Sequence, residues 1–136
     1  MTVLAQVRRL SATELRSALY NDNKTRVLTI DCRPFLAYNA SHVRGSHNIH
    51  FPRILRRRCK GSLPLKHILT CPDTREELLS GVYPLVVVYD EKSTDLSAGR
   101  GDEGDILPVL QTLLDEPISH LTTEVCFLEG KYYYCM

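Results

Sequence analysis

Two short apolar segments constrain the fold of this chain more than any other feature. Residues Leu85–Asp90 read LVVVYD, and residues Val27–Asp31 read VLTID. Both segments are rich in β-branched and aliphatic side chains, and both end in an aspartate. Continuous apolar strands of this kind are typical of a parallel sheet that is covered on both faces. The sequence therefore predicts a buried, mainly parallel sheet.

Helical and turn patterns lie between these strands. Ser11 and Glu14 form a capping-box pattern, which predicts a helix from about Ala12 to Tyr20. Three further helices are expected: a short one after Pro34 to about Asn39, one that opens at Asp73 and closes at Gly81, and one over Asp105–Leu114. A turn and short strand are expected over His42–Ile49, a long loop over Ser93–Gly104, and a last strand over Val125–Leu128.

Strands that alternate with helices indicate an α/β domain with three layers, a mainly parallel sheet flanked by helices. The 136 residues, 43% of them hydrophobic, are enough for one domain with its own core. No apolar run approaches the roughly 20 residues needed to span a bilayer, and Arg8 and Arg9 interrupt any secretory signal. The five cysteines form no CxxC pair, so we expect neither disulfides nor a zinc site, and no cofactor.

The charge distribution points to a partner-binding surface. Arg53–Lys60 holds five cationic side chains in eight residues, and no Asp or Glu occurs between Cys32 and Pro72. Arg56, Arg57 and Arg58 therefore have no acid nearby in the sequence, and their forks are free to grip carboxylates or phosphates. Leu63 and Leu65 follow on either side of Pro64, which favours an extended segment with both leucines on one side. These features favour a protein partner that carries acidic residues beside an apolar groove; a solvated helix face is the alternative.

The order of several motifs resembles a rhodanese-like domain. IDCRPF at Ile30–Phe35 is followed by pieces of an H-I-x-G-A-x-N-I motif, namely Ser41–Val43, Gly45–Ser46 and Asn48–Ile49. Rhodanese enzymes carry a nucleophilic cysteine directly after the strand that here is Leu85–Tyr89. In this chain Asp90 stands there.

With the inserted arginine cluster and VVYDE at Val87–Glu91, the chain is similar to the non-catalytic N-terminal domain of MAP kinase phosphatases over roughly Leu10–Gly130. The resemblance implies that Arg56, Arg57, Arg58, Leu63 and Leu65 form a kinase interaction motif, with possible support from Arg53 and Lys60. It implies MAP kinases as partners, and RRRCKG favours the nuclear, inducible subgroup, so the nucleus is the expected location and the cytoplasm the alternative.

The chain departs from this family near its end. Glu129-Gly130 is followed by Lys131 and six residues in all, where the family continues with a second glycine and a closing helix. The phosphatase signature H-C-x-x-G-x-x-R does not occur, so these 136 residues are expected to form a single non-catalytic domain, as in a truncated or spliced form. Without the closing helix, an exposed apolar strip is expected at Val125, Phe127 and Val86–Val88, and with it self-association.

Two other functions remain open at this point. A rhodanese-type sulfurtransferase is disfavoured by Asp90 in place of the nucleophilic cysteine. A nucleic-acid-binding module is favoured by the basic stretch but disfavoured by the lack of interleaved aromatic residues, Phe51 being the one nearby. We therefore expect neither nucleic acid nor a membrane as a partner.

Overall fold

The computed structural model describes residues 7–20, 26–33, 35–49, 64–90, 106–115 and 123–129. They form one five-stranded sheet in the order β1-β5-β4-β2-β3, and every strand pair is parallel. The strands are β1 (Arg8–Ser11), β2 (Val27–Asp31), β3 (His47–Asn48), β4 (Leu85–Tyr89) and β5 (Glu124–Glu129). The helices are α2 (Ala12–Tyr20), α3 (Phe35–Ala40), α5 (Leu65–Ile68), α6 (Pro72–Leu79) and α7 (Ile106–Asp115). The prediction of an α/β domain with a parallel sheet is confirmed.

Strand β4 lies at the centre of the sheet, as its apolar sequence requires. Val86 pairs with Leu28 of β2 on one side and with Val125 of β5 on the other. Residues 86–89 are completely buried. Parallel pairing on both edges, with helices above and below, explains why this strand contains no charged side chain.

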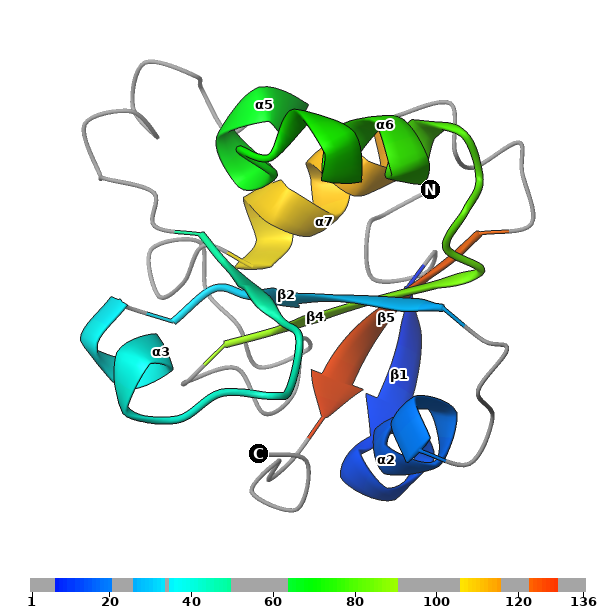
Figure 1. Cartoon of the computed structure of the whole chain (residues 1–136). Helices are drawn as coiled ribbons and strands as arrows, with labels where there is room; N and C mark the ends of the chain where they lie inside the picture. The colour runs from blue at the N-terminus through cyan, green and yellow to red at the C-terminus, as the bar shows by residue number, and fades with distance from the viewer. Residues whose placement is uncertain are drawn as a thin grey trace.

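Side chains of each strand alternate between two apolar layers. Helices α5, α6 and α7 lie together on one face of the sheet, and α2 lies on the other (Figure 1). Val86, Val88 and Phe127 belong to the core cluster that also contains residues of α5, α6 and α7. Val87 and Cys126 belong to a second cluster with Leu15 of α2. The domain is therefore a three-layer structure with a core on each side of the sheet.

The expected exposed apolar strip is wrong. Val125 is 6% exposed, and Phe127, Val86, Val87 and Val88 have no exposed surface. From the sequence alone, too few helices were expected over the face of the sheet that carries Val86 and Phe127. Helix α5, which the sequence did not predict, packs beside α6 and α7 on that face (Figure 1). Self-association through an exposed sheet face therefore has no basis in the described residues.

The N-terminal end of α2 has the predicted capping box. The Glu14 backbone N–H donates to Ser11 Oγ at 3.1 Å, and the Ser11 backbone N–H donates to Glu14 Oε1 at 3.2 Å. These bonds satisfy donors that the first turn of a helix leaves unpaired. Arg8 adds side-chain bonds to Glu14 at 3.0 Å and to Glu124 of β5 at 2.6 Å. The capping box is thereby tied to the edge of the sheet.

Two glycines with positive φ lie in turns, one after α6 and one before β3. Gly81, with a φ of 79°, follows α6, and the next backbone N–H, of Val82, donates to the Glu77 carbonyl at 3.0 Å. Gly45, with a φ of 78°, forms the turn before β3. Both positions favour glycine because a side chain strains the backbone at such φ values.

The predictions for the loop at Ser93–Gly104 and for the chain end at Lys131–Met136 lie outside the described residues.

Candidate partner-binding surface

The residues predicted to contact a kinase lie mostly outside the described segments. Those outside are Arg53, Arg56, Arg57, Arg58, Lys60 and Leu63; Leu65 alone is described. In the sequence, the arginine cluster lies between β3 and α5. Helices α5 and α6, which follow it along the chain, are described.

Leu65 begins helix α5 and points into the domain. Pro64 has the extended conformation predicted for it, with φ −62° and ψ 140°, but the chain turns into the helix at the next residue. Leu65 is 8% exposed and belongs to the same core cluster as Ile68 and Leu78. This burial favours a role for Leu65 in the core over insertion into a partner.

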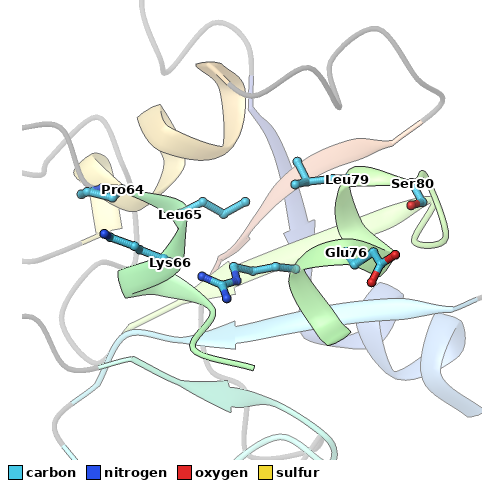
Figure 2. A pocket seen from close by; sticks show the side chains of 7 residues that line it. Pro64, Leu65, Lys66, Glu76, Leu79 and Ser80 are labelled. Atoms are coloured by element: carbon cyan, nitrogen blue, oxygen red, sulfur yellow. The ribbon is translucent and has the colours of Figure 1, made fainter. Parts of the chain in front are cut away.

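An open hollow of about 670 Å³ lies between α5 and α6 (Figure 2). Its lining residues come from the start of α5 and from one side of α6 and the residue after it: Pro64, Leu65, Lys66, Arg75, Glu76, Leu79 and Ser80. Leu79 is 44% exposed, unlike its neighbour Leu78, which is fully buried. The hollow thus combines an apolar lining with cationic side chains directly after the basic stretch.

The two cations of the hollow differ from Arg8 and Arg26 in their pairing. Arg8 and Arg26 form salt bridges, Arg8 with Glu14 and Glu124 and Arg26 with Glu77 at 2.8 Å. Lys66 and Arg75 form no salt bridge with any residue that the structure describes. The sequence pattern did not single out Lys66, Arg75 or Leu79. These three residues come together in the lining of the hollow only through the packing of α5 against α6.

A buried polar network lies at the carboxyl ends of β2 and β4. The Arg33 side chain donates to both carboxylate oxygens of Asp31, and Tyr89 Oη donates to Asp31 Oδ2 at 2.8 Å. The backbone N–H of Val43 donates in turn to Tyr89 Oη at 3.1 Å. Burial raises the pKa of the Tyr89 hydroxyl, and the nearby Asp31 charge adds to the shift. The network confirms that Asp31 and Arg33 hold the strand-to-helix turn together.

The position after β4 lacks the chemistry of a thiol enzyme. Asp90 follows β4 and is 6% exposed. A carboxylate there cannot serve as the thiolate nucleophile on which sulfur transfer depends. Asp31 is likewise occupied by Arg33 and Tyr89.

The described cysteines have different environments. Cys71, at the N-terminal end of α6, is exposed, and hydrogen bonding with Thr74 lowers the pKa of its thiol. Burial raises the pKa of Cys126 to about 12, and the negative charge of Glu124 adds to the shift. Cys32 is buried, as expected for the end of a core strand. Cys71 is thus the exposed thiol of these three, and its lowered pKa favours the reactive thiolate form.

Neither a metal centre nor a membrane helix emerges from the described segments. No three His, Cys, Asp or Glu side chains among them gather closely enough to hold a metal ion. None of the helices in these segments is both long and apolar enough to cross a bilayer.

The fold and the motifs around Asp31 define the class of this protein. The sequence profile of the rhodanese-like domain matches residues 11–132, so the chain belongs to the rhodanese-like domain family. It is also similar to dual specificity protein phosphatase 1 of Mus musculus, with 41% identity over 123 residues, which cover 90% of this chain and 32% of the relative.

Two further relatives extend this similarity. Dual specificity protein phosphatase 1 of Homo sapiens is 38% identical over 130 residues, which are 96% of this chain and 34% of the relative. Dual specificity protein phosphatase 4 of Rattus norvegicus is 42% identical over 108 residues, which are 79% of this chain and 26% of the relative. The chain spans about a third of the length of the relatives it matches. The predicted resemblance to phosphatase-associated rhodanese-like domains is confirmed.

Proposed function

We propose that this domain is a docking module that binds MAP kinases and has no catalytic activity of its own. The observation that carries the proposal is the basic cluster Arg56–Arg58, which lies in an acid-free stretch between β3 and α5 of a rhodanese-like domain. The similarity to dual specificity protein phosphatases supports it, because such enzymes need a means of selecting their protein substrates. The same similarity leads us to propose the nucleus as its location.

Charge recognition supplies the selectivity in this proposal. Arg56, Arg57 and Arg58 offer planar guanidinium forks that pair with carboxylates in two parallel hydrogen bonds. Arg53 and Lys60 extend the positive surface on both sides of the cluster. Complementary charge speeds association and disfavours partners without an acidic site.

The apolar half of the motif divides between two roles. We propose that Leu63 enters an apolar groove of the kinase beside the acidic site. Leu65, the second leucine of the predicted motif, is 8% exposed in the free domain. Its contribution to docking is therefore mainly indirect, since it anchors the start of α5 in the core.

The biological role follows from docking without chemistry. A longer protein that carries both this domain and a phosphatase domain would bring its active site to the bound kinase. The present 136 residues, which lack the H-C-x-x-G-x-x-R signature, would occupy the kinase without dephosphorylating it. In either form the domain acts as a negative element of MAP kinase signalling, in the second as a competitor of complete phosphatases.

The test is a direct comparison of partner classes. The fluorescently labelled chain is titrated with purified representatives of each main class of MAP kinase and, at the same ionic strength, with a short DNA duplex. We expect saturable binding to at least one kinase and weaker, salt-sensitive binding to DNA. Equal or tighter binding to DNA would replace the proposal with a nucleic-acid-binding function, and turnover of thiosulfate with cyanide would replace it with a sulfurtransferase.

A further inference from the structure

The hollow between α5 and α6 extends the docking surface beyond the basic cluster. We propose that it is a second contact site for the same kinase, receiving an apolar side chain that has a carboxylate beside it. This inference rests on the proposed function, since it assumes that the kinase docks at Arg56–Arg58. It assigns contact roles to Lys66, Arg75 and Leu79, which are not part of the predicted motif.

Only a few residues separate the basic cluster from the hollow along the chain. The hollow begins at Pro64, the residue directly after Leu63. An extended chain spans at most about 3.6 Å per residue, so Lys60 lies within about 14 Å of Pro64. A stable interface buries about 800 Å² on each partner, which corresponds to a disc about 32 Å across. By the same limit Arg56 lies within about 29 Å of Pro64, so one interface of this diameter can include both the arginine cluster and the start of the hollow.

The second argument is the apolar lining. Leu65 is buried, Leu79 is 44% exposed, and Pro64 is exposed (Figure 2). An exposed leucine alone is common on protein surfaces. Here it borders a hollow whose lining includes Leu65, a core residue, which gives a side chain from a partner a preformed place.

The third argument is charge. Lys66 and Arg75 form no salt bridge with the described residues, so a carboxylate of the partner can bind them without breaking an internal pair. Glu76 is the one acid that lines the hollow, and Figure 2 shows it on the side opposite Lys66. This asymmetry sets the orientation: the acidic residue of the partner lies toward Lys66, away from Glu76.

The decisive experiment compares two charge-reversed variants of the chain in titrations with the tightest-binding MAP kinase. Lys66→Glu/Arg75→Glu reverses the cations of the hollow. Arg16→Glu/Arg44→Glu changes the net charge equally, and both of its sites are exposed residues outside the hollow. We expect the hollow variant to bind about tenfold or more weakly than the control, because like charges at an interface are strongly unfavourable.

A second pair tests the apolar contact. Leu79→Ser removes the leucine at the rim, and Leu36→Ser removes an 81% exposed leucine on α3 as its control. We expect Leu79→Ser alone to weaken kinase binding, by about three- to tenfold. Melting curves for all four variants establish that each remains folded at the temperature of the titrations.

The outcomes separate this inference from the proposed function. If the unmodified chain binds no kinase, the docking function itself is wrong. If the chain binds, and replacement of Arg56–Arg58 weakens binding while the hollow variants match their controls, docking stands and the second contact is overturned. A chain that dimerises in sedimentation experiments, and becomes monomeric with Leu79→Ser, would assign the hollow to a second copy and also overturn the inference.

Discussion

The guanidinium of Arg33 lies against the carboxylate of Asp31 inside the domain, with Arg33 Nη2 2.8 Å from Asp31 Oδ2. The side chains are 7% and 0% exposed, respectively. Asp31 ends β2, and Arg33 also donates a hydrogen bond to the carbonyl of Ser41. The pair therefore connects the end of a core strand with the segment that leads to β3.

Breaking this pair should destabilise the domain strongly. In Arg33→Ala, the buried carboxylate of Asp31 loses its counter-charge, which typically costs about 3–5 kcal/mol of unfolding free energy. Urea denaturation measures the loss, with Arg44→Ala, an exposed arginine, as the control. A loss no larger than that of the control would show that the pair is not needed for stability.

The capping box at α2 should contribute a smaller amount. Ser11→Ala removes the oxygen that accepts from the Glu14 backbone N–H, and loss of such a cap typically costs about 0.5–2 kcal/mol. The melting temperature should fall accordingly, whereas Thr13→Ala, an exposed change within the same helix, should have little effect. If both variants melt alike, the hydrogen bond adds no net stability.

Leu65 and Leu63 should respond differently to replacement by alanine. Leu65→Ala opens a cavity beside Ile68 and Leu78, which should cost about 2–5 kcal/mol of unfolding free energy. The remaining folded protein should keep most of its kinase affinity. Leu63→Ala should reduce affinity, by about 1–3 kcal/mol, if its side chain is buried in the kinase groove. Melting curves and titrations on the same samples separate the two effects. A pure loss of affinity in Leu65→Ala would place Leu65 in the kinase groove.

Alkaline pH should destabilise the domain through Cys126. Burial raises the pKa of its thiol to about 12 in the folded state, above the ordinary value of 9.0. Between these values the unfolded chain loses the proton and the folded chain keeps it, so stability falls as pH rises. The contribution is fully present below about pH 9 and falls by about 1.4 kcal/mol per pH unit above it.

The measurement for Cys126 is the slope of unfolding free energy against pH. Cys126→Ala should be less stable at neutral pH but should show a shallower decline between about pH 9 and 10. Cys71→Ala, at an exposed thiol, should keep the steeper slope of the unmodified chain. Equal slopes in all three proteins would mean that the Cys126 thiol ionises at an ordinary pH.

Much of the fold could be predicted because its central elements carry strong local signals. The limits expected for α2 at Ala12 and Tyr20 match the structure, since the capping box marks the start and a polar cluster follows the end. Strands β2 and β4 were evident from their continuous apolar sequence. Core strands of a parallel sheet are recognisable because both of their faces are buried.

Two elements had no such signal. Strand β1 has one buried side chain, Leu10, and becomes a strand through its pairing with β5. Helix α5 is four residues long and directly follows a proline. The extended conformation expected around Pro64 was therefore predicted for Leu65 as well, which is wrong because Leu65 begins the helix. The hollow could not be foreseen because it depends on how this short helix packs against α6, a contact between segments without a common pattern.

The most direct test of the central claim is the affinity of the variant Arg56→Ala/Arg57→Ala/Arg58→Ala for its MAP kinase at physiological salt. We predict a loss of about 2–5 kcal/mol of binding free energy, because the carboxylates of the kinase lose their paired cations. We also predict that binding of the unmodified chain weakens with added salt. An affinity equal to that of the unmodified chain, with the variant folded, would contradict the account.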